Sequence, residues 1–234
     1  IYITAWLNSL ETAALATLLC LLLGYPMALA IARSAGAWRH VLLLLIMLPF
    51  WTSFLLRIYA WIGILNDHSW ANRGFTWLIN LLLPAASSLD HLPLMNTQFA
   101  VILGIVYSYL PFMILPLYSS LEKLDRTLEE AALDLGSPPW QVFRDVTLPL
   151  SLPGIIAGAM LVVIPATGEY VIPSLLGRND SPMIGKVLSD EFFLSRDWPL
   201  AAAVAIVLLV TLVVPIMLHS WLAGRRAHTA AGAT

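Results

Sequence analysis

Long apolar blocks without charges constrain this chain more than any other feature of its sequence. A helix that crosses a bilayer needs about 20 such residues. Blocks of roughly this kind cover residues 12–32, 41–56, 92–121, 146–168 and 198–224. The second block reaches the required length only by continuing past Arg57 to Leu65. Only 11% of the 234 residues are charged, against about 25% in soluble domains. We therefore expect an all-α integral membrane protein, a single bundle over residues 1–234 with about five spans.

Basic residues indicate the orientation of the bundle, because cytoplasmic loops retain more Lys and Arg than outer loops. Seven lie in the loops of one side: Arg33, Arg39, Lys123, Arg126, Arg144, Arg225 and Arg226. Four lie on the other: Arg73, Arg178, Lys186 and Arg196. The first side is thus expected to be cytoplasmic, with Ile1 outside and Thr234 inside. This arrangement also predicts a further span upstream, the first of six.

The largest outer loop, residues 66–96, is rich in Pro, Ser, Asn and Asp. Trp70, Trp77 and the leucines at 81–83 lie within it. Such aromatic and apolar residues in a polar segment predict a short helix lying at the membrane interface.

Residues 127–149, TLEEAALDLGSPPWQVFRDVTLP, are too polar for the bilayer and predict two short helices. Thr127 and Glu130 have the spacing of a capping box, in which each side chain accepts a hydrogen bond from a free backbone N–H. Gly136 is expected to end the first helix, and Pro149 to end the second. Leucine and alanine recur along the first helix at i, i+3, i+4 and i+7, forming a stripe of Leu128, Ala131, Ala132 and Leu135. Spacing alone fits either a docking element or a hairpin that shields the bundle.

A motif within this loop resembles a known family. Glu130, Ala131 and Ala132 are followed at fixed distances by Gly136, Val146, Leu148 and Pro149. This series is similar to the EAA loop of binding-protein-dependent ABC importer permeases, with valine in place of the usual isoleucine. The resemblance implies the type I ABC importer fold and a loop that docks on an ATPase subunit. The residues expected to couple to the ATPase are Glu129, Glu130, Ala131, Ala132, Gly136, Trp140 and Arg144. Glu129 and Glu130 would meet basic groups there, unless Glu130 closes its own capping box.

The chain itself carries no nucleotide-binding loop. Gly185-Lys186-Val187 lacks the hydroxyl residue that such a loop needs and lies on the outer side. The histidines are scattered, with neither an HExxH pair nor a Cys/His cluster. We therefore expect a non-enzymatic subunit without a cofactor or metal of its own, and ATP and Mg²⁺ held by a partner ATPase.

Further segments resemble the spermidine/putrescine branch of these permeases, and putrescine permeases in particular. They are residues 8–28, 48–65, 165–177 and 191–199. The resemblance implies a bacterial inner-membrane location, membrane lipid around the chain, a second permease of the same fold, an ATPase dimer and a periplasmic polyamine-binding protein. The net charge of −2 gives no reason to expect a nucleic-acid partner.

A path for polyamines should offer carboxylates and aromatic faces that replace water around each ammonium group. Glu169, beside Tyr170 and between Pro165 and Pro173, is the carboxylate lying deepest in an apolar run. Arg57 would repel a cation there. It could pair with Glu169 as an outer gate, form a permanent bridge with it, or extend to the interface.

Five aromatic residues are candidates for cation-binding faces in the path: Trp51, Tyr59, Trp61, Tyr107 and Tyr109. Such residues also anchor helices at headgroup level. Trp51 and Tyr59 are favoured because they lie in the polyamine-type segment. Two other functions stay open: an importer of another cargo, such as an anion, iron or a sugar, and a secondary transporter or channel driven by an ion gradient.

Overall fold

The computed structural model describes residues 2–82, 92–178 and 182–231, and these residues form helices without any strand. The α-helices are α1 (Tyr2–Arg33), α2 (Ala37–Met47), α3 (Phe54–Leu65), α4 (Trp70–Leu82), α5 (Gln98–Glu122), α6 (Arg126–Asp134), α7 (Pro139–Val142), α8 (Leu148–Thr167), α9 (Val171–Leu176), α10 (Ile184–Asp190) and α11 (Trp198–Ala231). A 3-10 turn follows α2 at Leu48–Trp51, and π-helical turns follow α7 at Phe143–Thr147 and α10 at Glu191–Ser195.

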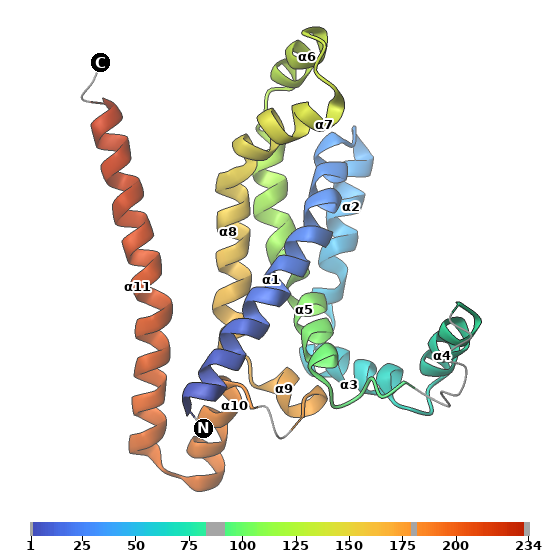
Figure 1. The fold of residues 1–234 in the computed structure, drawn as a ribbon, viewed down its shortest axis with the longest axis vertical. Coiled ribbons are helices and arrows are strands. Elements are labelled where there is room, and N and C mark those ends of the chain that lie inside the picture. Colours follow the sequence, from blue (N-terminus) through green and yellow to red (C-terminus); the bar gives the residue numbers. More distant parts are fainter. Residues whose placement is uncertain (1, 83–91, 179–181, 232–234) are drawn as a thin grey trace.

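Three long helices, α1, α5 and α8, form the core of the bundle (Figure 1). Small residues let them approach closely, as is usual for helices packed inside a membrane. The buried face of α1 carries Ala13, Ala16, Cys20, Gly24 and Ala28, spaced by three or four residues. Gly158 of α8 shows how close the packing is. A Cβ atom placed on it would lie 2.8 Å from the sulfur of Met113 on α5 and 3.0 Å from that residue's backbone oxygen.

The two ends of the bundle carry different elements (Figure 1). The N-terminus, α3, α4, α9 and α10 lie at one end, which the charge distribution predicts to be periplasmic. The EAA loop, α6 and α7, lies at the other end. Helix α11 runs between the two ends and stands beside the core (Figure 1).

Three of the described helical segments are long and apolar enough to cross a membrane: Tyr2–Arg33, Gln98–Glu122 and Pro139–Thr167. Trp198–Val214 is a shorter apolar stretch at the start of α11. The expected span through residues 41–65 is not one continuous helix, because Ala37–Trp51 and Phe54–Leu65 bend by 88° relative to each other. Pro49 cannot donate a backbone hydrogen bond, and Thr52 adopts an extended conformation with φ −95° and ψ 153°. The chain therefore leaves the helix before it reaches Arg57.

The outer loop contains the expected short helix, α4 (Trp70–Leu82). Trp70, Trp77 and Leu81 are more than half exposed on it. Leu83, the last residue of the predicted helix, lies outside the described residues. A position at the membrane interface stays a prediction.

Candidate functional site

Glu169 lies in the turn between α8 and α9 and is 8% exposed. Its Oε1 atom accepts hydrogen bonds from the backbone N–H groups of Tyr170 at 3.1 Å and Val171 at 2.9 Å. A longer bond of 3.4 Å comes from Ile172. The free N–H groups at the start of a helix favour a negative charge beside them. The carboxylate is therefore held in a fixed position by the start of α9.

Tyr109 of α5 occupies the other oxygen of Glu169, donating its hydroxyl hydrogen bond to Oε2 at 2.5 Å. Tyr109 lies eleven residues beyond Gln98, the first residue of α5, a rise of about 17 Å along the helix axis. This is close to half the thickness of a bilayer's hydrocarbon core, about 30 Å. Glu169 also follows the end of the 20-residue helix α8 by two residues, so the carboxylate lies in the half of the bundle away from the EAA loop.

Glu169 faces a cavity of about 410 Å³ between α3, α5, α8 and α9. Its aromatic lining consists of Phe50, Phe54, Tyr109, Phe112 and Tyr170. Arg57 and Ser108 add two polar side chains to the lining. The hydroxyl of Ser108 is buried and has no hydrogen-bond partner among the described residues. One carboxylate, one guanidinium, a free hydroxyl and several rings thus surround a space of ligand size.

Arg57 shares this cavity with Glu169, but among the described residues no ion pair joins the two. The guanidinium carbon of Arg57 instead lies 5.2 Å from the ring centre of Phe50 and 5.6 Å from that of Phe54. Its Nε and Nη1 atoms are buried without hydrogen-bond partners in the described part of the chain. The ion pair considered from the sequence, as a gate or a bridge, is absent from this conformation.

The other predicted path residues divide into two groups. Tyr170 lines the cavity. Trp51 and Tyr59 do not line it and are 81% and 57% exposed on the surface of the chain. Phe50 and Phe54 line the cavity where Trp51 and Tyr59 were expected. The spacing of Phe54 and Arg57, three residues apart on one helix, is the sequence signal that could have identified this pair.

The first helix of the EAA loop begins differently from the capping-box prediction, which is wrong. Asp125 is the cap of α6, and its carboxylate accepts a hydrogen bond from the backbone N–H of Thr127 at 3.0 Å. This bond lowers the pKa of the Asp125 carboxyl. Asp125 precedes the predicted motif by two residues and fits a cap equally well, since Asp and Thr are both preferred there.

Gly136 ends α6 as predicted, with a φ of +85° that favours glycine. The N–H of Ser137 bonds to the carbonyl of Ala132 at 3.2 Å, and that of Gly136 to the carbonyl of Leu133 at 2.9 Å. These two bonds define a Schellman motif.

The second helix of the loop does not end at Pro149, contrary to the prediction. Residues Pro139–Thr167 form one helical segment of 29 residues that passes through the π-helical turn into α8. Pro149 lies within the first two residues of α8. The wider π turn accommodates a proline there, where a missing N–H costs little. The EAA loop is therefore joined to α8 without a break.

The two adjacent carboxylates of α6 have different surroundings. Glu129 forms an ion pair with Arg33 at the end of α1, with N–O distances of 3.1 and 3.2 Å. It also accepts a hydrogen bond of 2.7 Å from the hydroxyl of Thr147. Glu130 is exposed. The expectation that both carboxylates face the ATPase therefore suits Glu130, whereas Glu129 ties α6 to the bundle.

The remaining residues expected to couple to the ATPase lie on the surface of the loop. Trp140 is 69% exposed and stacks on Phe143, with ring centres 5.6 Å apart. Arg144 pairs with Asp145 at 2.8 Å. In the predicted stripe, Ala131 is exposed and Ala132 partly buried, while Leu128 and Leu135 are 49% and 87% exposed. This apolar surface points away from the bundle.

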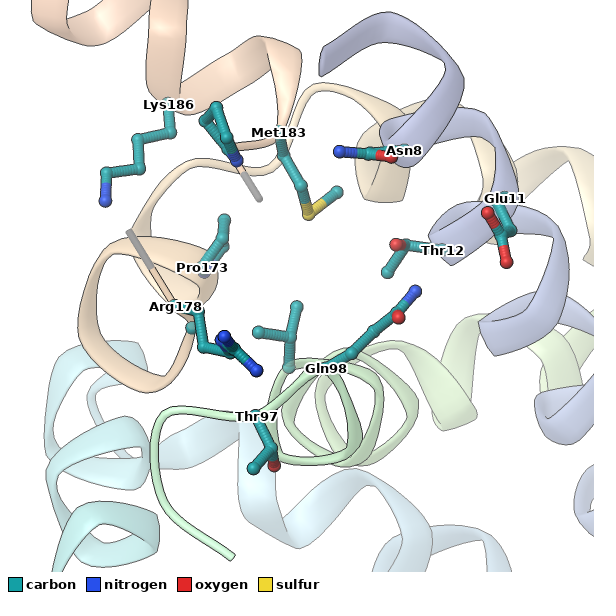
Figure 2. A pocket seen from close by; sticks show the side chains of 12 residues that line it. Asn8, Glu11, Thr12, Thr97, Gln98, Pro173, Arg178, Met183 and Lys186 are labelled. Carbon is teal, nitrogen blue, oxygen red and sulfur yellow. The ribbon is translucent and has the colours of Figure 1, made fainter. Parts of the chain in front are cut away.

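A second cavity, of about 270 Å³, lies at the opposite end of the bundle from the EAA loop. Figure 2 shows Arg178 and Lys186 on one side of it and Glu11 of α1 on the other. Asn8, Thr12, Thr97 and Gln98 contribute polar groups, and Pro173 and Gly177 bring in α9. Helix α9 therefore has Glu169 at its start and the outer cavity at its end.

Residues 21–226 match the family described as "Binding-protein-dependent transport system inner membrane component". This chain belongs to that family. It is an all-α inner-membrane permease of the ABC importer type, as the EAA motif predicted, and not an enzyme.

Sequence similarity to other permeases extends over nearly the whole chain. The "Spermidine/putrescine transport system permease protein PotB" of Haemophilus influenzae is 44% identical over 212 residues, covering 91% of this chain and 72% of the relative. Its namesake in Escherichia coli is 41% identical over 225 residues, covering 96% and 79%. A bacterial ABC transporter "involved in the import of the acidic polysaccharide alginate" has a similar structure, with a TM-score of 0.66, 17% identity and coverage of 94% and 79%. At this identity the last similarity supports the permease fold alone.

Proposed function

We propose that this permease forms part of the translocation path of an ATP-driven polyamine importer. The observation that carries the proposal is the buried carboxylate of Glu169, which faces an aromatic cavity between membrane-type helices. A carboxylate and aromatic rings can replace part of the water around an ammonium group. Relatives named for spermidine and putrescine transport favour the same cargo.

The proposal includes the usual partners of such a subunit. A second permease of the same fold would complete the path, and a periplasmic polyamine-binding protein would deliver the cargo. An ATPase dimer would hold ATP and Mg²⁺, so that this chain needs no cofactor. The exposed surface of the EAA loop, with Glu130, Leu135 and Trp140, suits a contact with that ATPase.

A rigid link supports the coupling role. The loop continues into α8 through one helical segment, and α8 ends two residues before Glu169. A movement imposed on the loop by closure of the ATPase would therefore reach the turn that holds the carboxylate. Helices joined in this way can transmit rigid-body movements between distant sites.

Uptake of radiolabelled putrescine into proteoliposomes containing the whole importer tests this function. Glu169→Gln keeps the size of the side chain and removes its charge, so uptake should fall at least tenfold while assembly is retained. Glu11→Gln, a matched change in the outer cavity, should change uptake less than twofold. Equal uptake by the wild type and Glu169→Gln would refute the role of Glu169. Absence of polyamine uptake by the wild type would refute the proposal that polyamines are the cargo.

A permease for an anionic cargo is the second candidate. One observation favours it, namely the two buried donor atoms of Arg57 that have no partner among the described residues. Guanidinium groups are well suited to bind carboxylates and phosphates. The same proteoliposomes would then take up a small organic anion but not putrescine.

A further inference from the structure

The guanidinium of Arg57 lies where a cationic ligand of this cavity would be expected. It contacts the faces of Phe50 and Phe54, and its carbon atom lies 5.2 and 5.6 Å from their ring centres. Aromatic faces at such distances attract lysine, arginine and ligand cations alike. An ammonium group entering the cavity would compete with Arg57 for these two rings.

Glu169 does not hold Arg57 in this position. Its two oxygens are occupied by three backbone N–H groups and the hydroxyl of Tyr109. An ionised carboxylate offers about four lone-pair sites, two on each oxygen. The three backbone N–H groups converge on Oε1, whereas Oε2 accepts from Tyr109 and keeps one site for a further donor. No ion pair joins Glu169 and Arg57 in the described part of the chain, and the guanidinium lies on the two rings instead. The cavity therefore contains separate positive and negative groups.

We propose that the guanidinium of Arg57 occupies the position that an ammonium group of the substrate takes when it binds. It occupies the aromatic faces of Phe50 and Phe54 when the cavity is empty, and it leaves them when a diamine binds. The inference rests on the proposed function, since it concerns the same cavity. It explains how a basic residue can lie in the path of a cationic cargo without forming an ion pair with Glu169.

The contacts of Arg57 make its displacement easy. Its Nε and Nη1 atoms have no hydrogen bonds to the described residues, so the interaction with the rings is the main one that must be given up. Such an interaction corresponds to roughly a two- to thirty-fold change in an equilibrium constant. A buried ion pair would resist displacement by a factor of about a hundred or more. The contacts therefore suit a removable occupant better than a permanent bridge.

The backbone around Arg57 also permits movement. Helix α3 begins after the extended residues Thr52 and Ser53 and is bent by 88° from the preceding helix. Because no continuous helix joins the two segments, α3 can turn without moving α2. Phe50 lies before the bend and Phe54 after it, so a rotation of α3 would separate the two rings that hold Arg57.

The test is equilibrium binding of radiolabelled putrescine to the assembled importer in nanodiscs. The complex is prepared with both permeases and the ATPase dimer, held with a non-hydrolysable ATP analogue, and left without the binding protein so that the membrane site alone is measured. Arg57→Gln removes the competing cation and should tighten putrescine binding about three- to thirtyfold. Arg73→Gln removes a charge from the exposed surface of α4 and should leave binding within twofold.

Restoring a cation by chemical means provides a second readout. In Arg57→Ala, guanidinium chloride at a few millimolar should compete with putrescine, whereas in the wild type it should have little effect. Unchanged or weaker putrescine binding in Arg57→Gln would overturn the inference, as would failure of that variant to assemble. Absence of binding to wild type and variant alike would also contradict it. Normal putrescine uptake alongside any of these results would leave the proposed function intact, whereas loss of polyamine uptake in the wild type would refute that function itself.

Discussion

Replacement of Glu129 by alanine should loosen α6 from the bundle, whereas replacement of its neighbour Glu130 should not. Glu129 holds Arg33 and Thr147 from two other segments, whereas Glu130 is exposed and has no such contact within residues 2–82, 92–178 and 182–231. The side chains of Arg33 and Glu129 are 52% and 21% exposed, so their ion pair contributes about 0.5–1 kcal/mol. The Thr147 hydroxyl is buried and donates to a charged acceptor, which adds about 1–2 kcal/mol.

Amide hydrogen exchange of α6 in the assembled permease measures this effect. Loss of about 2 kcal/mol from the closed state corresponds to roughly thirtyfold faster exchange through local opening. We expect a ten- to fiftyfold increase in Glu129→Ala and less than a twofold increase in Glu130→Ala. A double-mutant cycle with Arg33→Gln should return a coupling energy of about 0.5–1 kcal/mol.

Similar exchange rates in both alanine variants would show that the contacts of Glu129 with Arg33 and Thr147 do not hold α6 on the bundle. A coupling energy near zero would restrict the role of Glu129 to its bond with Thr147. Glu130→Ala should instead reduce ATP-driven uptake through its contact with the ATPase, without an effect on α6 itself.

Three further predictions concern the cavity and the cap of α6. A Cβ atom at Gly185 would meet the backbone oxygen of Glu169 at 2.7 Å, so Gly185→Ala should lower putrescine uptake at least fivefold, while Gly63→Ala, which meets no atom within 4 Å, should not. Tyr109→Phe removes the hydroxyl that donates to Glu169 and should weaken putrescine binding about tenfold or more; unchanged binding would separate Tyr109 from the site. The pKa of Asp125 is lower in the folded state than in the unfolded state. The ionised Asp125 therefore stabilises α6 fully above the unfolded pKa of about 3.9, and this stabilisation is lost as the pH falls through the lower folded pKa. Exchange of α6 amides should accelerate over that acidic range, and Asp125→Asn, which still caps a helix, should remove this pH dependence.

The sequence predicts the glycine end of α6 because that determinant is local, but it misplaces the cap of α6 and the end of the second helix. The positive φ of Gly136 follows from the conformations open to glycine. Periodicity places Leu135 on one face with Leu128, but only the structure shows that this face is exposed. Adjacent residues on a helix point about 100° apart, so Glu129 and Glu130 must face different directions. Periodicity does not say which of the two faces the bundle. Only the packing of α6 against Arg33 and Thr147 assigns one carboxylate to the bundle and leaves the other exposed.

The cavity is harder to predict because its residues come from distant segments. Glu169 is recognisable as a carboxylate deep in an apolar run, but its partner Tyr109 is 60 residues away in the chain. The bend after Pro49 decides which aromatic residues face Arg57. Prolines are tolerated within membrane helices, so Pro49 alone did not predict a turn of 88°. Without knowledge of that turn, the sequence favoured Trp51 and Tyr59 and did not identify Phe50 and Phe54 as candidates.

ATP hydrolysis by the complete importer in nanodiscs, together with its binding protein, tests whether this chain is a polyamine permease driven by a partner ATPase. Hydrolysis is measured without cargo and with putrescine, spermidine, a sugar or a small organic anion. We expect several-fold stimulation of hydrolysis by a polyamine and none by the sugar or the anion. Stimulation by the sugar or the anion, with no response to either polyamine, would contradict this expectation.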